Sequence, residues 1–233
     1  MSALDGVDFS SLDRVSGHSC CAGLFQLTST YYEAGTVIYA EGSKFDGVYF
    51  VEHGIAKMEM LLEGETALTS LALCGDVMGI DSFHGKTYAS SAVCVADLSV
   101  VWVPAECFYF LVRTNGSFRL RIEEAIGKAI LESTTMIKLL SRDEADAKVA
   151  YLLLKIFLGR RRELQNKNAF NVGLSRAEMA DYLGLRMETV SRKLATLRNL
   201  GIIRVKGRRI YVRDCEGLRQ LCSSVSKMMY QPY

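Results

Sequence analysis

Between Tyr31 and Pro104 the hydrophobic residues occur in short runs that glycine turns separate. The runs TVIYAEGS, GVYFVEHGIAKMEML, ETALTSLALCGDVMG and YASSAVCVADLSVVWV are rich in the β-branched and aromatic residues that strands prefer. Short, evenly spaced strands with turn signals predict a small antiparallel barrel or roll. Residues 1–30 are expected to form a partly helical lead-in. The glycines that punctuate the runs are Gly35, Gly42, Gly47, Gly54, Gly64, Gly75 and Gly79.

From Ala105 onward the spacing of hydrophobic residues becomes helical. We predict a short helix over residues 105–114, a break at Asn115-Gly116 and a long helix over residues 118–140. Small and apolar residues recur along the long helix at alternating steps of four and three, the spacing of a coiled-coil seam. This predicts a homodimer, although the same face could instead pack on the chain's own barrel. The predicted seam is Ile122, Ile126, Ala129, Ser133, Met136 and Leu140, widened by Ile130 and Ile137.

The next helix is predicted from a capping pattern. Ser141 and Glu144 have the spacing of a capping box, in which a serine at the helix start pairs with a glutamate three residues later. The chain is therefore expected to bend near Leu140–Ser141, at a hinge between two domains. The helix that follows should bury Leu152, Leu153, Ile156 and Phe157.

The segment LSRAEMADYLGLRMETVSRKLATLRNLGIIRVKGRRIYV predicts two helices joined by a tight turn and followed by two strands. Ser175 and Glu178 form a second capping box, which opens a helix over residues 176–183. Gly184 supplies the turn, because glycine adopts a positive φ at little cost. A second helix over residues 187–200 then precedes strands at 202–205 and 210–212. This order is that of a helix-turn-helix followed by a β-wing.

Charge is distributed unevenly along the chain. The net charge is +2, but residues 155–213 contain 15 Lys and Arg against 4 Asp and Glu. The remaining residues carry an acidic excess. One part of the chain therefore suits a polyanion and the other does not. A solvated basic surface is the alternative interpretation.

The second helix of the pair has two distinct faces. One face carries Val190, Leu194 and Leu197, and the opposite face carries Glu188, Ser191 and Arg192. Arg can donate two hydrogen bonds to guanine, Glu can accept one from cytosine and Ser can serve several base edges. These three residues are predicted to read base pairs in a major groove, unless the helix only covers a core. Phosphate contacts are predicted for Arg176, Arg186, Lys193, Lys206, Arg208 and Arg209.

Taken in this order, the elements over roughly residues 24–220 resemble the CRP/FNR family of bacterial transcription regulators. The motif GLRMETVSR, and the segments GDVMGID and LLSRDEADAKVAYLLLKI, are similar to the FNR branch. The resemblance implies an α+β fold. It places an N-terminal antiparallel β-roll, like a cyclic-nucleotide-binding domain, at residues 1–115, a dimerisation helix and hinge at 116–141, and a C-terminal winged helix-turn-helix at 142–233.

The resemblance also implies a function. A homodimeric activator of this kind would bind an inverted repeat with TTGAT-like half-sites in double-stranded DNA and recruit RNA polymerase. Glu188, Ser191 and Arg192 would be the readers. The turn at residues 62–66 and the loop at 80–85 are candidate polymerase contacts. Arg186 precedes the reading helix, where relatives usually have Ser or Thr.

The sensor region departs from both branches of the family. The cyclic-AMP branch has an Arg-Ser pair whose arginine meets the cyclic phosphate, whereas this chain has Ser90 and Ser91 there. FNR holds an iron–sulfur cluster on spaced N-terminal cysteines and one barrel cysteine. Here the N-terminal cysteines are the adjacent Cys20 and Cys21, and Val101 occupies the barrel position. The three histidines are scattered, so haem is not expected either.

We therefore expect no cofactor and no metal. Cys20 and Cys21 could be redox-sensitive, and control without any small ligand is a further alternative. Seven cysteines without a CxxC motif favour reduced thiols. No apolar run reaches the ~18 residues of a membrane span, and no signal peptide is evident, so a cytoplasmic protein without membrane contacts is expected. No catalytic motif indicates an enzyme. The main rival is a small-molecule or cyclic-nucleotide-binding module whose helical C-terminal part serves protein contacts.

Overall fold

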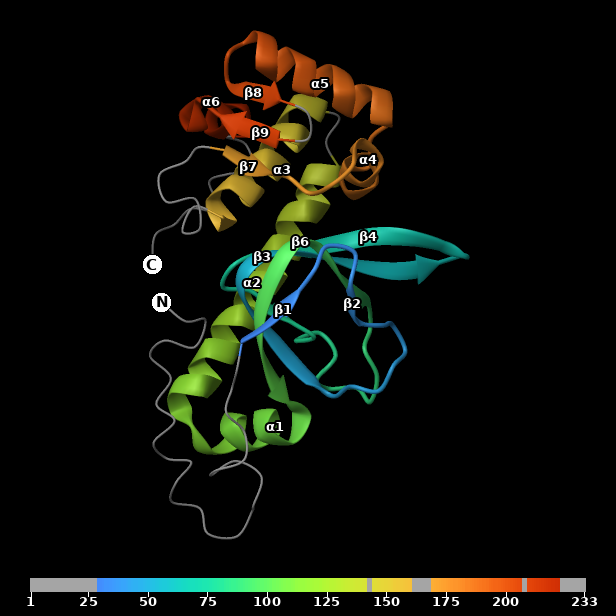
Figure 1. Cartoon of the computed structure of the whole chain (residues 1–233), viewed down its shortest axis with the longest axis vertical. Helices are drawn as coiled ribbons and strands as arrows, with labels where there is room; N and C mark the ends of the chain where they lie inside the picture. Colours follow the sequence, from blue (N-terminus) through green and yellow to red (C-terminus); the bar gives the residue numbers. More distant parts are fainter. Residues whose placement is uncertain (1–28, 142–143, 161–168, 207–208, 223–233) are drawn as a thin grey trace. The chain divides into compact units, whose positions relative to one another are not determined.

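The structure is a computed structural model that describes residues 29–141, 144–160, 169–206 and 209–222 (Figure 1). The chain divides into two compact units. Unit 1 comprises Met1–Thr66 and Leu71–Lys128, and unit 2 comprises Ala67–Ser70 and Ala129–Tyr233. The predicted fold class is confirmed, with an antiparallel β-roll, a long helix and a C-terminal winged helix-turn-helix.

The β-roll is built on two long paired strands. β3 (Gly47–Leu62) and β6 (Ser91–Pro104) pair antiparallel, with register shifts between Val51 and Ala56 that mark bulges. Gly54 lies in this irregular stretch with φ 93, and an added Cβ would come within 2.1 Å of the Asp97 carbonyl oxygen, so only glycine fits. The sheet is completed by β1 (Ser29–Tyr32), β2 (Val37–Tyr39), β4 (Glu65–Ala72) and β5 (Val77–Met78).

Two helices close the core of the roll. α1 (Ala105–Thr114) has the predicted bounds, and α2 (Gly116–Leu140) begins two residues earlier than predicted. Asn115 ends α1, and its side-chain oxygen accepts a hydrogen bond from the Phe118 N–H at 2.9 Å, which caps α2. The Phe118 ring packs near Phe50 and Phe108 inside the roll.

The predicted seam on α2 is wrong at its N-terminal end. Ile122 is 4% exposed and lies in the core of the roll, and Ile126 packs against the same core. The large apolar side chains that stay exposed on α2 are Leu120, Ile130, Ile137 and Leu140. The sequence pattern could not separate these two faces, because the core stripe and the exposed stripe both repeat at helical spacing.

The capping box predicted at Ser141 does not form. The Ser141 hydroxyl donates instead to the Lys138 carbonyl at the end of α2. α3 (Ala145–Gly159) starts after Glu144, which makes no side-chain capping bond. The division between the two compact units lies inside α2, after Lys128.

α3 is a buried helix that attaches to the second half of α2. Every residue from Ala147 to Phe157 is buried, which includes the four predicted apolar residues. The Lys155 Nζ lies 3.0 Å from a Glu132 carboxylate oxygen, and the Lys148 Nζ donates to the Leu140 carbonyl at 3.3 Å. Buried lysines require such partners, because an unpaired charge in the interior is costly.

The remaining elements of unit 2 form the winged helix-turn-helix. Helices α4 (Arg176–Leu183) and α5 (Met187–Asn199) agree closely with the prediction. A three-stranded sheet in the order β7-β9-β8 packs beside them, and α6 (Cys215–Leu221) follows. The strands are β7 (Ala169–Asn171), β8 (Ile203–Lys206) and β9 (Arg209–Val212).

Candidate nucleic-acid interface

The angle between α4 and α5 is fixed by local backbone chemistry. Both bonds of the predicted capping box are present: the Glu178 N–H donates to the Ser175 hydroxyl, and the Ser175 N–H donates to the Glu178 carboxylate. Gly184 ends α4 with φ 58, and the Leu185 N–H then donates to the Ala180 carbonyl at 2.9 Å. A side chain at Gly184 would be strained in this left-handed conformation. The turn therefore sets the direction in which α5 leaves.

α5 buries one face and exposes the other. Val190, Leu194 and Leu197 are at most 3% exposed, as predicted. Figure 1 shows α5 along the outer edge of its unit, with α3, α4 and the small sheet on its inner side. The helix ends at Asn199 with Leu200 as its C-cap, and Gly201 follows at the C′ position with φ 75.

The three predicted readers are exposed on one face of α5. Ser191 and Arg192 follow Glu188 by three and four residues, so both side chains lie next to that of Glu188 on the helix surface. Within the described part of the chain, none of the three side chains makes a hydrogen bond or an ion pair. Their donors and acceptors are therefore available to an external partner.

Basic residues flank this face. Arg186 and Lys206 are exposed, as the predicted phosphate contacts require. Arg186 occupies the N-cap position of α5 and makes no side-chain capping bond. Sequence reasoning did not single out Arg204, which is exposed on β8 of the wing. Alternation along the β8 strand, with Ile203 buried, could have indicated it.

The other predicted phosphate contacts differ in their surroundings. Arg176 is half-buried, and burial lowers the pKa of its guanidinium, which lies 3.5 Å from the Met179 sulfur. Arg209 lies on β9 opposite Lys206, at the end of the wing hairpin. Arg208 lies outside the described residues. The wing thus brings at least two basic positions to the same end of the hairpin.

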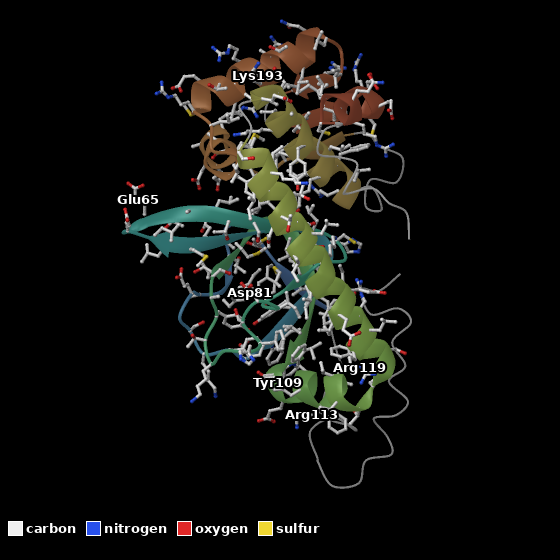
Figure 2. The ribbon with its side chains drawn as sticks, turned by 180° about the vertical axis from the view of Figure 1, so that it is seen from behind. Glu65, Asp81, Tyr109, Arg113, Arg119 and Lys193 are labelled. Atoms are coloured by element: carbon white, nitrogen blue, oxygen red, sulfur yellow. The ribbon has the colours of Figure 1, made fainter. Side chains whose placement is uncertain are left out.

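Lys193 differs from the other predicted phosphate contacts. Its side chain is 24% exposed, and its Nζ lies 2.5 Å from a carboxylate oxygen of Asp146 on α3. Lys193 is labelled in Figure 2. The structure therefore pairs this lysine with a carboxylate of its own chain.

The interior of the β-roll is filled with tyrosines near Ser90. The rings of Tyr39 and Tyr88 stack with centroids 3.9 Å apart. The Tyr88 hydroxyl lies 2.7 Å from the Gly47 carbonyl and also contacts the Asp46 carboxylate. Ser90 is 3% exposed, and its hydroxyl lies near that of Tyr39, although neither reaches hydrogen-bond geometry in the described region. Burial is the main cause that raises the pKa of Tyr39, and the Asp81 carboxylate adds to it.

Two carboxylates act on the tyrosines of this interior. They belong to Asp46 and Asp81, which are exposed, whereas Ser90, the residue that the family resemblance places at the arginine of the cyclic-AMP branch, is buried. Tyr39 and Tyr88 already occupy the space beside Ser90.

The cysteines of the described region are free thiols. Cys94 and Cys222 are buried, and burial raises the pKa of the Cys222 thiol to about 11. Cys20 and Cys21, the predicted redox pair, lie outside the described residues. Among the residues that are described, no group of three or more His, Cys, Asp and Glu side chains is placed to hold a metal ion. No described helix has the length and apolarity to cross a membrane.

Known proteins match both halves of the chain. A model of the cyclic nucleotide-binding domain matches residues 29–115, and a model of the Crp-like helix-turn-helix domain matches residues 147–221. The structure of FixK2 from Bradyrhizobium japonicum superposes with a TM-score of 0.71 at 28% identity, over 83% of this chain and 96% of that one.

Two curated relatives are similar over most of their length. The transcriptional activator protein Anr of Pseudomonas protegens is 28% identical over 77% of this chain and 74% of its own. The anaerobic regulatory protein of Haemophilus influenzae is 29% identical over 79% of this chain and 72% of its own.

A β-roll of the cyclic-nucleotide-binding type, joined through a long helix to a winged helix-turn-helix with a free basic face, defines a DNA-binding transcription regulator. The relatives that match most of the chain are named as a transcriptional activator, an anaerobic regulatory protein and FixK2. The chain belongs to the CRP/FNR family of transcription regulators.

Proposed function

We propose that the protein is a homodimeric activator that reads an inverted repeat of TTGAT-like half-sites in the major groove. The observation that carries this proposal is the free, exposed face of α5 with Glu188, Ser191 and Arg192, opposite a fully buried face. Arg192 would donate to guanine, Glu188 would accept from cytosine, and Ser191 would complete the contact. Arg176, Arg186, Lys206, Arg208 and Arg209 would hold the phosphates, with Arg204 added from the structure.

The proposed dimer uses the exposed stripe of α2. Ile130 and Ile137 are 62% and 69% exposed and one heptad apart. Leu120, Gly127 and Thr134 continue the stripe at the same spacing and are also exposed. Two copies joined along this stripe would present two α5 helices about one DNA turn, ~34 Å, apart. The predicted seam residues Ala129, Ser133 and Leu140 remain exposed beside it, and Met136 is half-buried.

Activation by recruitment of RNA polymerase is the second part of the proposal. The relatives named as transcriptional activators support it. Residues 62–66, at the turn between β3 and β4, are all exposed, whereas Ile80 and Ser82 in the other candidate loop are buried. The turn is therefore the better candidate for a polymerase contact. Such a protein would act in the cytoplasm, where it meets bacterial DNA.

We further propose that the β-roll works without a cyclic nucleotide, an iron–sulfur cluster or haem. The support is the packing of Tyr39 and Tyr88 beside Ser90, where the cyclic-AMP branch would have an arginine, together with the cysteine spacing, which does not match that of FNR. The rival function is a ligand-binding module whose helices make protein contacts. It does not explain why the exposed face of α5 is surrounded by basic residues and makes no side-chain bonds within the described chain.

The proposed function is tested by measuring binding to an inverted repeat and to a scrambled duplex at several salt concentrations. Specific binding with a steep salt dependence is expected, because phosphate contacts release counterions. Arg192→Ala should cost about 1–3 kcal/mol on the specific site and relax the base preference there. Arg113→Ala, at an exposed arginine at the end of α1 (Figure 2), is the matched control and should bind as the wild type does. Equal affinity of the wild type for both duplexes would reject the proposal.

A further inference from the structure

Lys193 lies on the flank of α5 that faces α3. It follows the buried Val190 by three residues and precedes the buried Leu197 by four, so it belongs to the inner side of the helix. Its Nζ is 2.5 Å from the Asp146 carboxylate, and its side chain is less exposed than that of Asp146, at 24% against 41%. The readers Glu188, Ser191 and Arg192 are exposed on the other side.

Asp146 is itself held in place. It lies in the first turn of α3, where the partial positive charge of the helix end favours a carboxylate. α3 is anchored in turn by two lysines, since Lys155 pairs with Glu132 and Lys148 donates to the Leu140 carbonyl, both on α2. The contacts Glu132–Lys155, Leu140–Lys148 and Asp146–Lys193 thus form a continuous path from the second half of α2 to α5, all within unit 2.

We propose that Lys193 is a positioning residue whose ion pair with Asp146 fixes the rotation of α5 about its own axis. This inference rests on the proposed function. Two hydrogen bonds from one guanidinium to one guanine need a defined orientation, so a helix that can roll loses base discrimination before it loses phosphate contacts. Lys193 therefore increases base discrimination by holding Arg192 in the correct orientation. Other residues contact the phosphates.

The two roles of Lys193 predict different salt dependences. If Lys193 positions α5, Lys193→Gln should lower the affinity for the specific repeat about two- to five-fold, the usual effect of a partly exposed ion pair. The slope of log K against log salt concentration should stay the same. If Lys193 bound a phosphate, the slope would fall by about 0.9 for each phosphate that is no longer neutralised, or about twice that for a dimer.

Asp146→Asn separates the two roles by the sign of its effect. A positioning pair predicts that Asp146→Asn weakens specific binding as much as Lys193→Gln does. A phosphate role predicts tighter binding, because the variant removes a negative charge and releases the lysine. The double variant should bind no more weakly than either single variant, since both remove the same ion pair.

The experiment is fluorescence anisotropy of the full chain with the repeat and the scrambled duplex at four salt concentrations. Lys206→Gln is the control for a phosphate contact and should reduce the slope, and Lys193→Arg should retain the ion pair and the affinity. Each variant is first compared with the wild type by thermal melting. The slope of log K against log salt concentration is then measured, because it reports the number of phosphate contacts and does not depend on the stability of the fold. A reduced slope in Lys193→Gln, or tighter binding by Asp146→Asn, overturns this inference alone. A wild type without specific binding overturns the proposed function and the inference with it.

Discussion

The Tyr88 hydroxyl is buried at the point where two loops of the β-roll meet. It contacts the Asp46 carboxylate and the Gly47 carbonyl, and its ring packs against Gly79, where an added Cβ would come within 3.0 Å. Burial, the main cause, and the hydrogen bond to Asp46 raise the pKa of Tyr88 well above its ordinary value. One side chain thus links these backbone segments of the roll by packing and hydrogen bonds.

Alkaline pH should destabilise the β-roll through this tyrosine. A raised pKa means that the folded chain keeps the phenolic proton at a pH where the unfolded chain has released it, so the free energy of unfolding decreases above about pH 10. Tyr88→Phe should cost about 1 kcal/mol at pH 8, because the variant cannot make these hydrogen bonds, and should flatten the alkaline decline. Denaturant unfolding between pH 8 and 11 measures both effects. A decline of the same steepness in both proteins would contradict this assignment.

Helix α2 serves different partners along its length. Its first half is tied to the β-roll by Phe118, Ile122 and an Arg121 bond to the Gly75 carbonyl, and its second half is tied to α3 through Glu132. The exposed stripe with Ile130 and Ile137 runs along the remaining face. A single helix can contact the β-roll and α3 and still expose a stripe, because at 3.6 residues per turn its side chains point to different sides.

A charge on the exposed stripe should separate dimerisation from folding. Ile137→Glu should weaken the dimer and, with it, binding to the inverted repeat, while the melting of the β-roll stays close to that of the wild type. Ile126→Glu should instead destabilise the roll, because Ile126 packs against its core. Sedimentation velocity and thermal melting of both variants measure the difference. A fully dimeric Ile137→Glu protein would show that the stripe is not the seam.

At the scale of the whole molecule, charge and chemistry are divided between the two halves. Residues 155–213 hold the basic excess, and the exposed carboxylates of Asp46 and Asp81 act on the tyrosines of the β-roll. The basic half therefore suits a polyanion. The proposal that the β-roll works without a cyclic nucleotide is tested by adding the nucleotide.

Cyclic nucleotides should leave both stability and DNA binding unchanged. A ligand at 100 times its Kd stabilises the folded chain by about 2.7 kcal/mol, so specific binding would raise the melting temperature by a measurable amount. Cyclic AMP and cyclic GMP at millimolar concentration are expected to produce no such rise and no gain in affinity for the repeat. The specific duplex itself is the positive control for a ligand-induced rise. A rise with either nucleotide would show that the roll opens to admit it.

The two capping boxes show how far local patterns reach. Ser175–Glu178 and Ser141–Glu144 have the same residues at the same spacing, but only the first one forms. Ser141 still belongs to the last turn of α2, since its N–H donates to the Ile137 carbonyl, so its hydroxyl turns back to Lys138. The local sequence allows Ser141 either to cap α3 or to belong to the last turn of α2. The tertiary structure selects the last turn of α2.

The sequence by itself determined the kinds and the order of the elements, the turn at Gly184 and the two faces of α5. These follow from hydrophobic period, capping and glycine conformation, which act over a few residues. Only the tertiary structure decided that Lys193 pairs with Asp146, that Ile122 is a core residue and that tyrosines fill the roll beside Ser90. Each of these depends on residues that are distant in sequence, and the period of one helix cannot show which of its faces another part of the chain will cover.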